Sequence, residues 1–191
     1  MTGLCRPKIP ILPYFPNRLE APTRKLEIYS AWMGIENILA ELIDRFHINT
    51  DVCLEFGVEH GFSTVALSSY FNRVIGVDTF LGDRHTQNKQ DIYEETRGRL
   101  AQYQNIELVR SDYRDFIQKD PGYFGLIHVD IVHTFEDTFA CGLWSAQHSQ
   151  CAIFHDTESF PQVKRAVIEI ARGTGKRFFN FRRSYGLGIL V

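Results

Sequence analysis

Five short apolar runs alternate with stretches of helical periodicity, and this alternation constrains the fold more than any other feature of the chain. The runs read DVCLEF, RVIGVD, IELVRSD, GLIHVD and CAIFHD, and four of them end in aspartate. The clearest helical pattern lies at residues 163–171, where apolar side chains recur at i, i+3, i+4, i+7 and i+8. Such an alternation predicts a doubly wound α/β fold, with a mostly parallel sheet covered by helices on both faces.

The two ends of the chain add to this pattern. KRFFNFRR and YGLGILV are two further strand-like runs separated by one serine, so we expect seven strands, the C-terminal one antiparallel. Five of the seven prolines fall in the first 22 residues, which excludes a helix or a central strand there. We expect residues 1–24 to form an extended arm that hangs free, covers a sheet edge or reaches a partner subunit. Residues 25–191 are expected to form a single domain.

Composition and charge exclude several function classes. The net charge of −2 provides no overall attraction to nucleic acid or to an anionic membrane. No apolar run reaches the roughly 18 residues of a membrane span. Prolines stand where a signal peptide has its apolar core, and the four cysteines contain no CxxC pair. We therefore expect a cytoplasmic protein that acts on neither nucleic acid nor membranes.

The turn within LEFGVEHGFST, residues 54–64, indicates what the chain binds. Gly57 and Gly61 are four residues apart, unlike the closer glycines of the dinucleotide fingerprint, and Glu55 would repel a pyrophosphate. A carboxylate there suits a ligand that carries an ammonium group. Asp78 ends the next expected strand, at the same rim of the sheet, where it can accept both ribose hydroxyls. Together these residues indicate a positively charged nucleoside, and S-adenosylmethionine is such a molecule.

Five stretches, in this order, resemble the motifs of class I S-adenosylmethionine-dependent methyltransferases. LEFGVEHGFSTVAL resembles the first motif, and the resemblance continues through VIGVDTFLGD, IELVRSDYRDF, GLIHVDIVHTFEDT and IFHDTESFPQVKRAVIEIA. It covers about residues 35–191 and extends to the small group that includes macrocin-type sugar O-methyltransferases and relatives of cephalosporin hydroxylase. The resemblance implies a Rossmann-like fold and O-methylation of a small molecule, either a sugar or a secondary metabolite.

The resemblance also implies which residues bind the cofactor. They are the ones that match the motifs: Glu55, Gly57, Gly61, Ser63, Asp78, Thr79, Asp112 and Asp130. The glycine turn would surround the methionine part, and Asp78 would hold the ribose beside Thr79 and the adenine. Asp112 would contact the adenine amino group, and Asp130 would lie beside the sulfonium and the acceptor. Two structural alternatives stay open, a tight turn without a ligand at the glycines and a helix cap at Asp112.

The fourth motif, DIVHTFE at residues 130–136, departs from the family pattern. Relatives carry D-x-D here, with the first carboxylate on a divalent metal and the second as the general base. Val132 replaces the second carboxylate, yet an alcohol acceptor needs a group that takes its proton. His133 and His155 can take a proton near neutral pH, so the expected catalytic residues are His133, Asp130 and His155. His133 can equally be a residue that only precedes a helix, since the T-x-x-D that follows it resembles a capping box.

The end of the fifth run carries His155 and Asp156, where macrocin-type enzymes have paired carboxylates. Asp130, His155 and Asp156 could hold Mg²⁺ or Mn²⁺, or the pair could only cap the strand. Val132 keeps open a second function, a protein that binds S-adenosylmethionine without transferring its methyl group. A nicotinamide dehydrogenase is disfavoured by the glycine spacing. The expected partners are a small-molecule substrate and, through the arm, a second copy of the chain.

Overall fold

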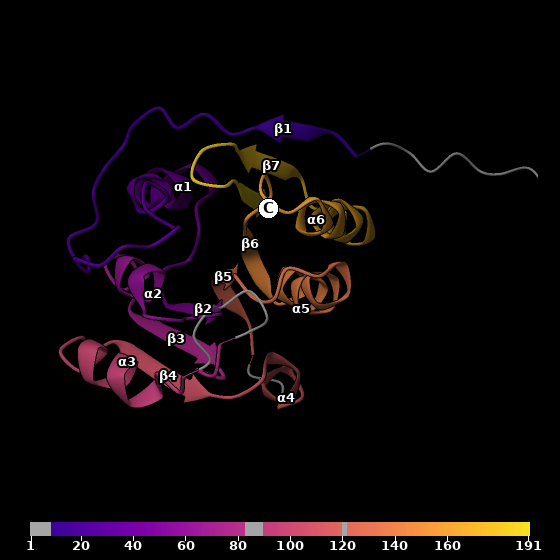
Figure 1. Cartoon of the computed structure of the whole chain (residues 1–191). Coiled ribbons are helices and arrows are strands. Elements are labelled where there is room, and N and C mark those ends of the chain that lie inside the picture. The colour runs from indigo at the N-terminus through magenta and orange to yellow at the C-terminus, as the bar shows by residue number, and fades with distance from the viewer. Residues whose placement is uncertain (1–8, 83–89, 120–121) are drawn as a thin grey trace, which may run out of the picture.

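A computed structural model describes residues 9–82, 90–119 and 122–191 (Figure 1). Within them one sheet has eight strands in the order β1-β7-β8-β6-β5-β2-β3-β4. The strands are β1 (Ile11–Pro13), β2 (Val52–Phe56), β3 (Arg73–Asp78), β4 (Ile106–Arg110), β5 (Phe124–Val129), β6 (Ser149–His155), β7 (Phe178–Phe181) and β8 (Leu187–Leu190). All pairs are parallel except those of β8 with β6 and β7. The predicted fold class is confirmed.

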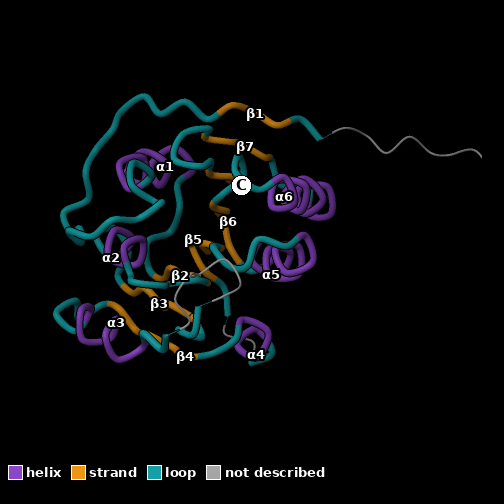
Figure 2. Tube along the Cα trace, viewed as in Figure 1, coloured by secondary structure: helices purple, strands orange, loops and turns teal. Residues whose placement is uncertain are grey.

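Helices cover both faces of the sheet (Figure 2). They are η1 (Glu36–Ile38), α1 (Leu39–Phe46), α2 (Phe62–Leu67), α3 (Tyr93–Leu100), α4 (Tyr113–Ile117), α5 (Phe135–Gln147) and α6 (Pro161–Thr174). The core on one face is formed with α1, α2 and α3, and the core on the other with α4, α5 and α6. Adjacent strand residues enter different cores, as Cys53 and Leu54 do, which explains the continuously apolar runs. Among the described helices, none is both long and apolar enough to cross a membrane.

The proline-rich arm covers an edge of the sheet, one of the three arrangements left open by the sequence. Its strand β1 pairs in parallel with β7 and is the eighth strand, in addition to the seven predicted. Tyr14, directly after β1, is 1% exposed and packs in the core near Phe46 and Phe181. The arm is therefore fixed to its own chain by both backbone pairing and side-chain burial.

The strand order reverses direction between β2 and β5, which places the loops after these two strands side by side. Phe56 and Val129 are register partners at the strand ends, and the Asp130 N–H donates to the Phe56 carbonyl at 2.8 Å. In open α/β sheets, a ligand binds at such a reversal, beyond the carboxyl ends of the strands. The fold thus brings Gly57 and Asp130 together at the expected position.

Candidate active site

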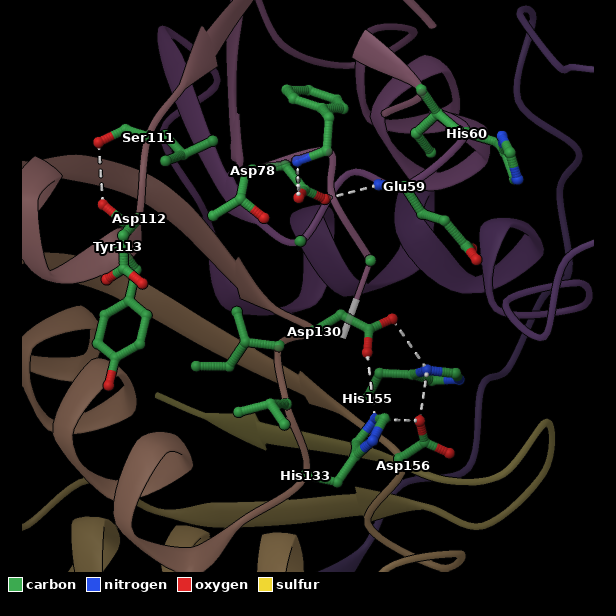
Figure 3. Close-up of a pocket in the computed structure, with 18 of the residues that line it drawn as sticks. Glu59, His60, Asp78, Ser111, Asp112, Tyr113, Asp130, His133, His155 and Asp156 are labelled. Atoms are coloured by element: carbon green, nitrogen blue, oxygen red, sulfur yellow. Dashed lines mark hydrogen bonds and ion pairs between the residues drawn. The ribbon is translucent and has the colours of Figure 1, made fainter. Parts of the chain in front are cut away.

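A cavity of about 730 Å³ opens at the carboxyl ends of the central strands (Figure 3). Most of the residues singled out from the sequence line it: Gly57, Asp78, Thr79, Asp112, Asp130, Val132, His133, His155 and Asp156. Three do not line it, namely Glu55, Gly61 and Ser63. Residues from five separate motifs therefore meet in one place, and the turn that connects β2 to α2 contributes through its first glycine.

Both glycines of the turn have a positive φ and leave little room for a side chain. Gly57 has φ +89°, and a Cβ there would lie 1.7 Å from the carbonyl oxygen of Asp130. Gly61 caps α2 with φ +86°, and its Cβ would lie 2.6 Å from the side chain of Leu100. Positive φ favours glycine, and the close approach of two backbones at Gly57 requires it. The glycine spacing is thus explained by the close packing of the turn against β5 and α3.

Glu55 lies beneath the turn and does not reach the cavity. Its side chain is fully buried, and its carboxylate accepts hydrogen bonds from the Thr64 hydroxyl and from Nδ1 of His128, the latter at 2.8 Å. This position differs from the expected contact with a ligand ammonium group, because the pleat of β2 points Glu55 towards α2. Ser63, the second residue of α2, is also buried at 8% exposure.

Asp78 connects the turn to the end of β3. Its Oδ2 accepts the backbone N–H groups of Val58 at 2.8 Å and Glu59 at 2.9 Å, and its Oδ1 accepts that of Phe80 at 2.7 Å (Figure 3). An ionised carboxylate offers about four lone-pair sites, and these three bonds leave one of them open, on Oδ1. The side chain can therefore hold the turn closed and accept one ligand hydroxyl as well.

Asp112 is the N-cap of α4, as the structural alternative for this residue predicted. Its Oδ1 accepts the Arg114 N–H at 2.8 Å, and its carboxylate forms an ion pair with the Arg114 side chain. It nevertheless lines the cavity beside Tyr113, on the side opposite His155 (Figure 3). Capping does not exclude a ligand contact here.

Two histidines and two carboxylates form a cluster at the other end of the cavity (Figure 3). Nδ1 of His155 lies 3.1 Å from Asp130 Oδ2 and 3.2 Å from Asp156 Oδ2. Nε2 of His133 lies 2.9 Å from Asp156 Oδ2 and 3.7 Å from Asp130 Oδ1. Nε2 of His155 donates to the carbonyl of Ser184 at 3.2 Å. Because a carbonyl oxygen only accepts, His155 must also carry a proton on Nδ1 to bond the two carboxylates, which makes it an imidazolium.

The charges in this cluster shift the pKa values of its members. Burial disfavours the charged form of His155, but the charges of Asp130 and Asp156 and their hydrogen bonds together outweigh it and raise the pKa to about 10. Burial acts in the same way on His133, and hydrogen bonds to Asp130 and Asp156 raise its pKa to about 9. Burial raises the pKa of Asp156, but hydrogen bonds from both histidines lower it to about 2. The pKa of Asp130 is likewise well below its usual value despite burial.

These shifts predict how stability depends on pH in ion-free protein. The histidine pKa values are raised above 6.5, so their contribution is fully present below about pH 6.5 and is lost as the pH rises through about 9 and 10. The stabilisation that Asp156 contributes is present above about pH 3.8 and is lost as the pH falls through about 2. Urea unfolding with a chelator present should therefore give a free energy of unfolding that declines above about pH 6.5. The decline should be smaller in His155→Gln, and a flat profile in the wild type would contradict the assignment.

The same cluster offers a candidate metal centre. One ligand atom each from Asp130, His133 and Asp156 can be chosen so that all lie within 4.8 Å of one another. His155, the histidine expected in this role from the sequence, is outside that group. Its Nε2 faces the Ser184 carbonyl and its Nδ1 lies against the two carboxylates. The geometry therefore favours His133 as the nitrogen ligand.

Several cavity residues were not predicted from the sequence. They are Ala31, Glu59, His60, Val77, Phe80, Gly82, Gln90, Ile92, Ser111, Tyr113, Arg114 and Ile131. Most lie within or next to the motifs already quoted, so their position in the chain was the available signal. Three were indicated by no motif: Ala31 comes from the segment before η1, and Gln90 and Ile92 lie between the second and third motifs.

Comparison with known proteins gives the family. Residues 54–157 match the family model described as a methyltransferase domain. The matched stretch comprises 104 residues, more than half of the 191 in the chain. The chain belongs to the methyltransferase domain family. The match extends from the residue before Glu55 to the residue after Asp156 and so includes every site residue predicted from the sequence.

Solved methyltransferase structures have a similar fold. The O-methyltransferase from Bacillus cereus in complex with SAH is 16% identical, with 86% of this chain and 82% of that chain covered and a TM-score of 0.62. The O-methyltransferase NovP is 15% identical over 78% and 74%, with a TM-score of 0.62. Fibrillarin from Aeropyrum pernix with natively bound S-adenosyl-L-methionine is 14% identical over 75% and 67%, with a TM-score of 0.55. At these identities the likeness is one of fold. No curated protein matches the sequence.

Proposed function

We propose that this methyltransferase domain binds S-adenosylmethionine and transfers its methyl group to an oxygen of a small molecule, either a sugar or a secondary metabolite. The observation that carries the proposal is the meeting of the glycine turn, Asp78 and Asp130 in one cavity at the reversal of strand order. Family membership and the bound cofactors of the B. cereus and A. pernix proteins support it.

The residues present fit this cofactor. Gly57 lines the cavity where the amino-acid part would lie, and Asp78 retains acceptor capacity for one ribose hydroxyl. Thr79, Asp112 and Tyr113 line the adjoining part of the cavity, where the adenine would lie. When bound, the cofactor supplies an electrophilic methyl group on a sulfonium. The chain holds the acceptor in line with that methyl group, and such positioning accounts for much of the rate of a direct displacement.

His133 is the proposed general base. Val132 lines the cavity where relatives have a carboxylate, and its side chain cannot take a proton. The His133 ring stacks on Phe160 with ring centroids 4.1 Å apart, which fixes its orientation, and its Nε2 faces Asp130 and Asp156. His155 is the less suitable base because both of its nitrogens already contact protein groups.

A divalent cation is the proposed second cofactor. Asp130, His133 and Asp156 would hold it, and the nitrogen ligand favours Mn²⁺ over Mg²⁺. Bound there, a cation would supply a Lewis acid for the acceptor oxygen. A cation would also compete with the proton on His133, so the ion and the imidazolium are alternative occupants of the cluster. His133 therefore acts as the base only in the ion-free protein, and its two proposed roles are alternatives.

Removal of one carboxylate tests the cation site without an activity assay. In chelator-stripped protein, Asp156→Asn is expected to weaken Mn²⁺ binding by roughly tenfold to a hundredfold, because a charged ligand becomes a neutral one. Asp112→Asn is the matched control, since it removes a carboxylate from the same cavity but from outside the cluster. Titration calorimetry in which both variants bind Mn²⁺ equally, or in which wild type binds none, contradicts the site.

We also place the chain with the macrocin-type O-methyltransferases and the cephalosporin hydroxylase relatives. The support is that Asp130 follows β5 and Asp156 follows β6, two positions at which that group carries carboxylates. Exposed apolar side chains of the arm, Ile11, Leu12 and Phe15, support a homodimer formed through the arm. If that dimer forms, light scattering should give a lower particle mass for Phe15→Ser than for wild type.

Transfer of a labelled methyl group from S-adenosylmethionine to a panel of sugars and phenols tests the proposed activity. We expect incorporation into at least one acceptor. The alternative function, binding without transfer, rests on Val132. It is favoured if wild type binds the cofactor and methylates nothing, while Val132→Asp gains transfer.

A further inference from the structure

A continuous chain of buried polar side chains lies beneath the cavity, and the activity proposed above does not use it. It consists of Trp32, His128, Glu55 and Thr64, each with 2% or less of its surface exposed. The four residues come from the segment before η1, from β5, from β2 and from α2. A buried polar network whose hydrogen bonds are all satisfied holds the elements that carry it in one specific arrangement.

The donors and acceptors in this chain have only one consistent assignment. Nε1 of Trp32 lies 3.1 Å from Nε2 of His128, and an indole N–H only donates, so Nε2 accepts. The proton of the neutral imidazole is then on Nδ1, which donates to Oε1 of Glu55 at 2.8 Å. The other carboxylate oxygen of Glu55 accepts the hydroxyl of Thr64. Both ring nitrogens and both carboxylate oxygens thus have a partner.

Each part of the chain adjoins a residue that lines the cavity. Trp32 directly follows Ala31 in the cavity wall. Glu55 and His128 are register partners in the paired strands β2 and β5. They stand two residues before Gly57 and Asp130, the lining residues whose backbones come into contact. His128 is the central member, because it alone bonds both the wall segment and the strand that leads into the glycine turn.

We propose that His128 is a positioning residue that holds the Ala31 wall and the glycine turn at a fixed separation and thereby sets the affinity for the cofactor. The ligand part of this inference rests on the proposed function. Loss of the imidazole would leave the Trp32 N–H and Oε1 of Glu55 without a partner in the core, with only the Thr64 hydroxyl still bonded to the carboxylate. A buried carboxylate that lacks a donor on one oxygen is strongly unfavourable, so the turn or the wall is expected to move until these groups reach water.

Backbone hydrogen exchange in the ligand-free protein tests the positioning directly. In His128→Leu we expect exchange at residues 29–35 and 57–64 to accelerate roughly tenfold or more, because the wall segment loses the bond of Trp32 and the turn loses the bond that anchors Glu55, two residues before it. His128→Gln should stay close to wild type, since its amide oxygen can accept from Trp32 and its amide N–H can donate to Glu55. Ile170→Ala, a core truncation in α6 with no hydrogen bond removed, calibrates general destabilisation. Equal exchange in His128→Leu and Ile170→Ala overturns the inference.

Affinity for S-adenosylhomocysteine, measured by calorimetry, is the second readout. His128→Leu should lose about tenfold or more while His128→Gln and Ile170→Ala remain within a few fold of wild type. Unchanged affinity in His128→Leu overturns the inference. If wild type does not bind this ligand, the proposed function is wrong, and the exchange result alone decides the positioning role. If His128→Leu does not fold, Trp32→Phe takes its place and should accelerate exchange in the same two segments. Unchanged exchange at residues 57–64 in Trp32→Phe overturns the inference.

Discussion

Gly57→Ala is expected to abolish cofactor binding and to lower the free energy of unfolding by about 2–5 kcal/mol. The added Cβ would lie 1.7 Å from the Asp130 carbonyl oxygen and 2.6 Å from its carbonyl carbon, in a conformation with φ +89°. Both atoms belong to the backbone, so no side chain can rotate away, and the ends of β2 and β5 must separate. Urea unfolding measures the stability, and calorimetry with S-adenosylhomocysteine measures the binding.

Gly98→Ala is the matched control for this substitution. Gly98 lies in α3 with no atom within 4 Å of the position of an added Cβ. Alanine there should stabilise the protein by about 0.5–1 kcal/mol through helix propensity and leave binding unchanged. If Gly57→Ala instead binds the cofactor as wild type does, the turn does not need the close approach seen in the structure.

His133→Gln is expected to lower the rate of methyl transfer by about 10²–10⁴ while leaving the affinity for S-adenosylhomocysteine nearly unchanged. The amide retains much of the shape of the ring but cannot take the proton of the acceptor. A base must be unprotonated to act. Because the His133 pKa is raised to about 9, the wild-type rate without added metal should increase with pH up to about 9.

His155→Gln is the comparison variant for this prediction. Its effect on the rate should be smaller, because the ring of His155 is bonded to the Ser184 carbonyl and to Asp130 and is not available to the acceptor. If both variants keep the full rate across this pH range, neither histidine is the base. If only His155→Gln loses activity, the roles assigned to the two residues are reversed.

Much of the fold could be predicted because local patterns determine it. The apolar periodicity at residues 163–171 became α6, and the run DVCLEF became β2 almost residue for residue. The position of the site followed as well, since parallel strands present their carboxyl ends at one edge of the sheet. The pairing of the arm with β7 did not follow, because prolines indicate an extended chain but not its neighbour.

The details that the sequence did not predict depend on contacts between distant segments. The side of the sheet that Glu55 faces was not evident, because both faces of β2 are buried and the run shows no polar alternation. The choice between His133 and His155 depends on the Ser184 carbonyl, which belongs to the loop before β8, 29 residues after His155. Ala31 lines the cavity, and the neighbouring Trp32 is bonded to His128, 96 residues away.

Calorimetric titration of the purified protein with S-adenosylmethionine tests the central claim most directly. Wild type should bind it and S-adenosylhomocysteine, and should bind NAD more weakly or not at all. Asp78→Ala should lose roughly tenfold to a hundredfold in affinity, because the ribose hydroxyls lose a charged acceptor and the turn loses the carboxylate that accepts its N–H groups. No binding by wild type, or tighter binding of NAD than of S-adenosylmethionine, would contradict the account.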